Sequence, residues 1–252
     1  MMRTSLAAVL VLCSLSAVAL AGPGTPYLQK AWNDRAERGL VQKGGAGQAG
    51  LTFDGAVNKG GDTFKPGILA LNGAYAPIDD LEIGLWFPMQ LLKPEGSKLL
   101  ASVGPLYAEY QFLDFLAARL AFDLPLDPKF EGKLIQFYVD VLAKYNFAPS
   151  FALVGSLGFN ANFGFDKGLK FIPFYLGAQY TFVADFWGQL LTGFNYNLEG
   201  MDFSSIPVFV KLGYTIMGNM DVGLNVALNN LNPPAGGAID SKSFGVFFSY
   251  LF

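Results

Sequence analysis

Six tyrosines recur at nearly equal intervals along most of the chain. They are Tyr75, Tyr110, Tyr145, Tyr180, Tyr214 and Tyr250, at spacings of 35, 35, 35, 34 and 36 residues. Three of them begin a Tyr-x-Phe pattern, which returns at the end of the chain as Tyr250-Leu251-Phe252. A unit of this length holds two strands of about 10 to 12 residues, one short turn and one longer loop. The repeat therefore predicts a series of β-hairpins, each with a tyrosine at the same end.

The last ten residues, 243–252, alternate between bulky apolar positions and a second, more varied set. The bulky face consists of Phe244, Val246, Phe248, Tyr250 and Phe252. A period of two is the pattern of a β-strand with unlike faces. Chain ends normally lie in water, whereas this chain ends on a large aromatic residue. We therefore expect the last strand to be held in an apolar or interfacial environment.

Alternation predicts twelve strands and an all-β fold, an up-and-down antiparallel β-barrel that spans a membrane. The predicted strands are residues 50–58, 67–76, 81–90, 102–112, 115–124, 133–145, 151–162, 171–182, 186–197, 205–216, 221–229 and 243–252. Short turns fall on the tyrosine side, and the longer loops, which carry Gly, Pro and charge, fall on the other. The alternative is a soluble all-β protein with its apolar face inward. That fold needs neither a tyrosine at every second turn nor a terminal phenylalanine.

The N-terminus has the pattern of a secretory signal peptide. Arg3 precedes an apolar run, and Ala19-Leu20-Ala21 forms an Ala-x-Ala cleavage site. The domain prediction is therefore a signal peptide at 1–21, a separate segment at 22–49 and the barrel at 50–252.

The separate segment contains a stretch from 27 to 41 whose apolar residues fit one stripe of a short helix. The stripe consists of Leu28, Ala31, Trp32, Ala36 and Leu40. Gly44-Gly45-Ala46-Gly47 would end such a helix. Two interpretations stay open for this segment: a mobile periplasmic lead-in, or a plug folded into the barrel.

The signal peptide, the tyrosine-marked hairpins, the short turns and the terminal aromatic strand together resemble the outer-membrane β-barrels of Gram-negative bacteria. The resemblance covers about residues 50 to 252. It implies export, a location in the outer membrane with membrane lipid as a partner, and short turns that face the periplasm. It also implies insertion by the barrel-assembly machinery, which reads the last strand. Phe248, Tyr250 and Phe252 match the aromatic positions of that assembly signal.

The composition argues against catalysis. The chain has no histidine, so the His-dependent arrangements of the known barrel enzymes and any His metal site cannot be assembled. Its one cysteine, Cys13, lies in the signal peptide. Without Arg3 the mature chain has 16 basic and 20 acidic residues, which leaves no basic patch for nucleic acid. We therefore predict no enzyme activity, no metal, no cofactor and no nucleic-acid partner.

The expected inner face of the barrel carries the candidate functional residues. A charge belt is predicted at Glu82, Glu109, Arg119, Asp140, Lys144 and Lys211, and an aromatic lining at Trp86, Tyr107, Tyr138, Tyr175 and Trp187. A turn centred on Asp114 places Glu109 opposite Arg119, with Asp140 beside Arg119 on the next strand. The charges either neutralise one another within the wall or form a constriction that orients a solute. The aromatic residues either fill space or stack against solutes.

A twelve-stranded barrel is wider than the filled eight-stranded barrels and narrower than a sixteen-stranded porin. The sequence therefore favours a passive pore or narrow channel for small solutes. The alternative is a closed barrel that has a structural role, or binds a ligand or partner, without conducting.

Overall fold

A computed structural model describes residues 34–58, 65–90, 102–125, 135–163, 170–183, 185–228, 231 and 241–252. The predicted signal peptide and Leu28, Ala31 and Trp32 of the predicted helix lie outside these residues. Among the described residues, no helix is long and apolar enough to cross a membrane.

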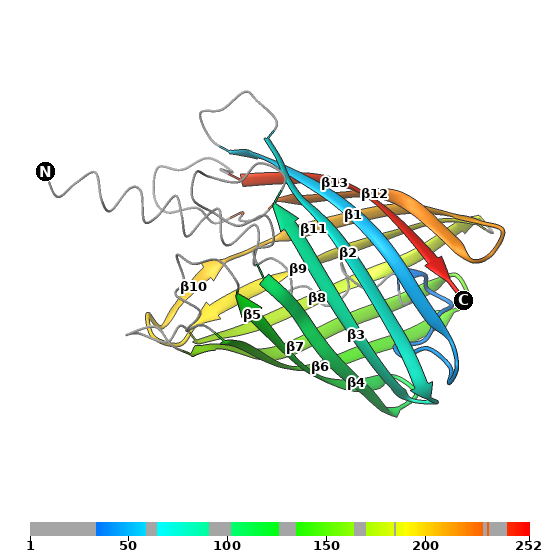
Figure 1. Cartoon of the computed structure of the whole chain (residues 1–252), viewed down its shortest axis with the longest axis horizontal. Coiled ribbons are helices and arrows are strands. Elements are labelled where there is room, and N and C mark those ends of the chain that lie inside the picture. The colour runs from blue at the N-terminus through cyan, green and yellow to red at the C-terminus, as the bar shows by residue number, and fades with distance from the viewer. Residues whose placement is uncertain are drawn as a thin grey trace, which may run out of the picture.

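The described strands form one antiparallel sheet (Figure 1). They are β1 (Gly47–Asn58), β2 (Lys65–Ile78), β3 (Leu81–Gln90), β4 (Ser102–Leu113), β5 (Leu116–Pro125), β6 (Ile135–Ala148), β7 (Phe151–Phe163), β8 (Lys170–Val183), β9 (Phe186–Asn197), β10 (Asp202–Ser205), β11 (Val208–Ile216), β12 (Met220–Leu228) and β13 (Ser241–Leu251). Each strand pairs with its sequence neighbours, except that β10 and β11 both pair with β9. These two short strands make one wall strand, interrupted at Ile206 and Pro207, since proline cannot donate to a strand ladder. The barrel therefore has the twelve strands that the sequence predicts.

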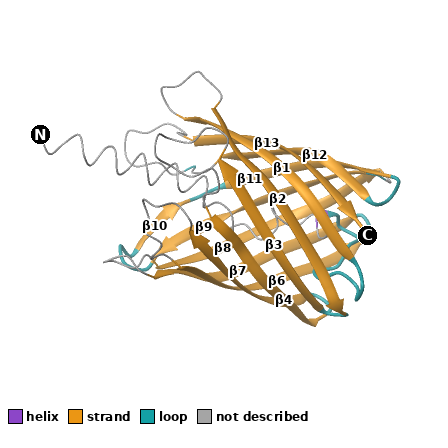
Figure 2. Cartoon of the chain, in the orientation of Figure 1, coloured by secondary structure: helices purple, strands orange, loops and turns teal. Residues whose placement is uncertain are grey.

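The first and last strands close the barrel (Figure 2). β1 pairs with β13 along its whole length, from Gln48 opposite Leu251 to Asn58 opposite Ser241. At the end of this ladder the amide of Gly47 donates to the carbonyl of Phe252 at 2.7 Å, and the amide of Phe252 donates back at 2.9 Å. The terminal aromatic strand is thus part of the wall up to its last residue.

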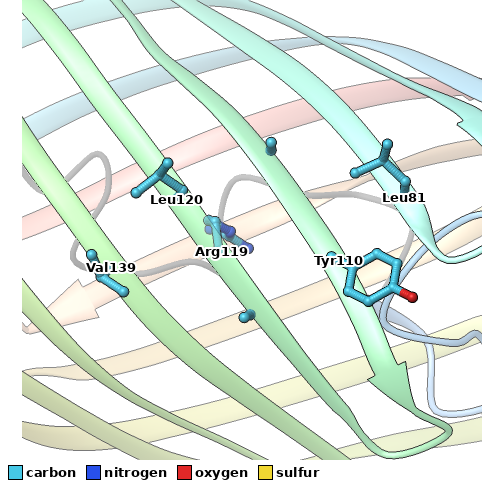
Figure 3. A pocket seen from close by; sticks show the side chains of 7 residues that line it. Leu81, Tyr110, Arg119, Leu120 and Val139 are labelled. Atoms are coloured by element: carbon cyan, nitrogen blue, oxygen red, sulfur yellow. The ribbon is translucent and has the colours of Figure 1, made fainter.

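The two faces of the wall have the polarity expected of a membrane-spanning barrel. Leu120 and Val139 are 49% and 40% exposed, while Arg119, next to Leu120 in the chain, is buried. Figure 3 shows these residues together around a shallow hollow in the outer face, with Leu81 and Tyr110 beside them. A soluble barrel would bury the leucines and expose the arginine, so the soluble alternative is wrong.

The six repeating tyrosines are all exposed and lie at one end of the barrel. The short turns lie at that end, as does the C-terminus (Figure 1). Next to two of the tyrosines, the phenylalanine of the Tyr-x-Phe pattern packs edge-on against the tyrosine ring, at 4.8 Å for Tyr145 with Phe147 and 5.0 Å for Tyr180 with Phe182. The rings form a girdle because a flat ring with a polar tip is favoured where the apolar band of the wall ends.

The residues before β1 do not form the predicted helix over their described part. From Asp34 to Ala46 the chain follows turns and bends, and β1 begins at Gly47, three residues before the predicted barrel start. Gly45 has a φ of 86°, which suits glycine and gives the tight turn into β1. In Figure 1 this blue segment lies at the tyrosine end of the barrel, and its hydrogen bonds join it to residues of the barrel wall.

Candidate functional site

Four of the predicted belt residues lie side by side on consecutive strands. The register places Glu82 of β3 opposite Glu109 of β4, Glu109 opposite Arg119 of β5, and Arg119 opposite Asp140 of β6. Nε and Nη2 of Arg119 donate to Oε2 of Glu109 at 3.1 and 2.9 Å. The predicted Glu109–Arg119 pair and the position of Asp140 are therefore found in the structure.

Tyr107, one of the five predicted aromatic residues, also belongs to this cluster. Its hydroxyl donates to Oε1 of Glu82 at 2.9 Å, and its ring centroid lies 5.2 Å from the guanidinium carbon of Arg119. The ring can lie across the wall because its neighbour on β3 is Gly84, where a Cβ atom would come within 2.2 Å of the ring. The guanidinium of Arg119 thus faces the carboxylates of Glu109 and Asp140, while Tyr107 presents its ring to the cation and donates a hydrogen bond to the neighbouring Glu82.

Lys211 lies in a second cluster, on the opposite part of the wall. Its Nζ pairs with the carboxylate of Asp34 and lies 4.3 Å from the ring centroid of Phe247. Trp187 packs 5.8 Å from Phe247 and is fully buried. Trp187 lies over Gly213, where a Cβ would come within 2.2 Å of the ring.

The remaining belt residue, Lys144, donates from Nζ to the backbone carbonyl of Arg35 at 2.6 Å. Glu82 also accepts from the backbone amide of Gln42, at 3.4 Å. Three of the six predicted belt residues, Glu82, Lys144 and Lys211, therefore bond to the segment that precedes β1. In this structure the charges of these three residues face the segment before β1, a partner that neither interpretation drawn from the sequence included.

The five predicted aromatic residues differ in exposure: some are buried among other side chains, and others are partly exposed. Tyr138 donates to Gln136 of its own strand, and Tyr175 donates to Oδ1 of Asn195 at 3.0 Å. Tyr175 also packs edge-on against Phe209 at 6.1 Å. Trp86, on the same face of β3 as Glu82, is only half-buried. Of the five aromatic residues, Trp86 and Tyr107 are thus the ones that keep partial exposure.

Asp34, Arg38 and Gln111 also contribute to the contacts between the segment before β1 and the wall, although no sequence motif marks them. Arg38 forms a bidentate pair with Asp221, with Nη1–Oδ2 at 2.5 Å and Nη2–Oδ1 at 3.2 Å. Gln111 accepts the amide of Val41 at 3.2 Å. The available signal was the density of charge in Asp34-Arg35-Ala36-Glu37-Arg38, which is unusual for residues that end up beside a wall of buried side chains. Among the described residues, no group of three or more His, Cys, Asp or Glu is placed to hold a metal ion.

Comparisons with known proteins agree on the architecture. No protein-family model matches the sequence, and no curated protein does. Among solved structures, the NanC porin is similar at a TM-score of 0.57 and 9% identity, over 79% of this chain and 98% of that one. The KdgM porin is similar at a TM-score of 0.53 and 13% identity, over 81% of this chain and 99% of that one. An outer-membrane channel from Pseudomonas putida F1 is similar at a TM-score of 0.50 and 10% identity, over 88% and 99%. At these identities the likenesses establish the fold: the chain is a closed twelve-stranded antiparallel β-barrel, the architecture shared with these outer-membrane proteins.

Proposed function

We propose that the protein is a passive channel of the outer membrane, for small polar solutes. The observation that carries the proposal is a closed wall whose inner face holds polar groups without protein partners. Within the described residues, both amide atoms of Gln189, Oδ1 of Asn160 and Nε1 of Trp187 are buried and have no protein hydrogen-bond partner. Buried polar groups of this kind are normally satisfied by ordered water, so they favour a hydrated interior. Water inside a closed barrel is the medium through which a small solute crosses.

The orientation and the partners follow from the same proposal. The tyrosine girdle and the short turns face the periplasm, the exposed leucines and phenylalanines face lipid, and the barrel-assembly machinery engages β13. Twelve strands leave an interior suited to small solutes rather than to folded chains.

One observation favours the second candidate, a barrel that does not conduct. Glu82, Glu109 and Gln179 have no exposed surface at all. Side chains that line an open aqueous pore would be in contact with bulk water, so the tyrosine end is closed to bulk water in this structure and holds at most single ordered waters. Planar-bilayer recordings of the refolded mature protein decide between the two candidates. Current steps support the channel, and silence under every condition, including those that displace the segment before β1, supports the non-conducting barrel.

The channel is expected to prefer cations modestly. The inner face carries six acids, Asp54, Glu82, Glu109, Asp123, Asp140 and Asp221, against three bases, Arg119, Lys144 and Lys211. An excess of negative charge inside a low-dielectric wall concentrates cations at the entrance. Reversal potentials across a salt gradient measure the preference. It should fade as salt rises from about 0.01 to 1 M, because the Debye length falls from about 30 to 3 Å. A preference for anions would contradict the prediction.

A further inference from the structure

We infer that the inner wall at the tyrosine end is a docking surface for the chain's own residues 34–46, and that this segment is a removable plug of the channel. The inference rests on the proposed channel function and names the part that closes it. Two buried ion pairs anchor the segment. Arg38 binds Asp221 of β12, and Asp34 binds Lys211 of β11. All four side chains are nearly or fully buried.

Hydrogen bonds to further strands show that residues 34–46 extend across the interior of the barrel. Asn146 of β6 donates to the carbonyl of Ala36 at 2.7 Å, and Thr181 of β8 donates to Glu37 at 2.9 Å. The bonds described above add Glu82 of β3, Gln111 of β4 and Lys144 of β6. Strands β3, β4, β6, β8, β11 and β12 lie all around the wall. A segment that bonds to all of them must cross the interior, and it therefore obstructs it.

The charge of the segment complements that of the wall. It contains three bases, Arg35, Arg38 and Lys43, and two acids, Asp34 and Glu37, so it carries an excess of one positive charge. The wall has an excess of three negative charges by the count given above. The segment therefore partly neutralises the wall when it is docked, which favours docking in the low-dielectric interior.

The contacts also explain why the plug is removable. They are ion pairs and hydrogen bonds, together with three buried apolar residues, Ala36, Leu40 and Val41. Of these, Leu40 belongs to the apolar cluster that includes Leu142 and Val154 of the wall. Near β1 the amide of Gly45, which lies in the turn before the strand, donates a hydrogen bond to the carbonyl of Ala76 at 2.7 Å. Polar contacts exchange for water at a small net cost, whereas the strand ladders that hold the wall are long and continuous. Release of the segment therefore leaves the barrel intact.

The test loosens the plug without touching the wall. Arg38→Ala, in the mature chain refolded into lipid, should raise the time-averaged conductance by roughly tenfold or more, since it leaves the buried carboxylate of Asp221 without its cation. Lys43→Ala is the matched control, because Lys43 is a basic residue of the same segment with an exposed side chain. Its conductance should equal that of the parent. Equal conductance of Arg38→Ala and the parent, with both of them conducting, would overturn the plug.

An engineered disulfide tests the opposite change, because it holds the segment in its docked position until the bond is reduced. The mature chain has no cysteine, and Asn146 contacts Ala36 directly, so Ala36→Cys with Asn146→Cys places one thiol on the plug beside one on the wall. We expect the oxidised form to be silent and the reduced form to regain the parent's current. Full conductance in the oxidised form would contradict the inference.

A chemical readout separates failure of the plug from failure of the channel. In the otherwise unchanged chain, the thiol of Ala36→Cys should resist a polymer-sized maleimide, because Ala36 is fully buried. In the double variant Ala36→Cys with Arg38→Ala, the same thiol should react faster. Rapid labelling in the parent overturns the plug, whatever the conductance. Protection in the parent, faster labelling with Arg38→Ala and no current in either would keep the plug and overturn the channel.

The docked segment should also respond to pH through Asp34, which lies before β1 and outside the membrane-spanning strands. Burial raises the pKa of Asp34 from 3.8 to about 6, although Lys211 and Arg38 oppose the shift, and Asp221 adds to it. A proton therefore binds the docked segment more readily than the released one. The stabilisation of docking is present below the ordinary pKa and is lost as pH rises through about 6.

Conductance should accordingly fall when pH is lowered from about 7 to about 5. Asp34→Asn should remove most of this dependence, because its side chain does not titrate. A parent whose conductance rises on acidification would contradict the assignment of this response to Asp34.

Discussion

Replacing Tyr250 and Phe252 together by serine should leave export intact and abolish insertion of the barrel. In the structure both rings point out of the wall, at 42% and 61% exposure, and stack at 6.2 Å. The hydrogen bonds that close β13 onto β1 at this end run through the backbone of Phe252 and survive the substitution. The loss would therefore fall on the outward aromatic surface of the last strand, the part available for recognition during assembly. Heat-modifiable migration on a gel measures the inserted fraction.

Phe244→Ser is the matched control for this experiment. Phe244 lies on the same strand and the same outward face, and it is 42% exposed, like Tyr250. It is an aromatic ring on this face that lies far from the chain end. We expect Phe244→Ser to insert normally. Normal migration of the double serine variant would show that the two terminal rings are not an assembly signal.

Replacing Arg119 by alanine should lower the free energy of unfolding by about 3 to 5 kcal/mol, the usual effect of removing one partner of a buried charge pair. Arg119 binds Glu109 and lies opposite Asp140, and Glu82 lies just beyond Glu109. Without the guanidinium, the carboxylates of Glu109 and Asp140 lose their shared cation, and Glu109 is left opposite the carboxylate of Glu82. Urea unfolding in detergent or lipid, followed by tryptophan fluorescence, measures the change.

Two further variants test the reason for this effect. Adding Glu109→Gln to Arg119→Ala removes one of the uncompensated charges and should recover part of the lost stability. Lys170→Ala removes a cation with an exposed side chain from β8 and should leave the unfolding curve unchanged. An unchanged curve for Arg119→Ala, together with altered ion selectivity, would instead assign the cluster to a constriction that contacts solutes.

The local part of this structure could be predicted from the sequence. Alternation sorts side chains between the two faces of a strand, because successive residues of a strand point to opposite sides. A short turn then fixes the register of the two strands it joins, so Glu109 could be placed opposite Arg119 from the position of Asp114 alone. The tyrosine spacing likewise determines hairpin length, since each hairpin returns to the same end of the wall.

The sequence by itself therefore determined the twelve strands, their facing, the girdle and the neighbours of Arg119, all of which depend on residues close together in the chain. Only the tertiary structure decided what lies inside the barrel. Arg38 and Asp221 are 183 residues apart, and Asp34 and Lys211 are 177 apart, so no period or turn relates them. Their pairing depends on the closed wall, which removes both partners from bulk water and makes each carboxylate require a cation within reach. From the sequence alone the segment before β1 could be either a mobile lead-in or a plug, because only the closed wall supplies the partners of its described residues.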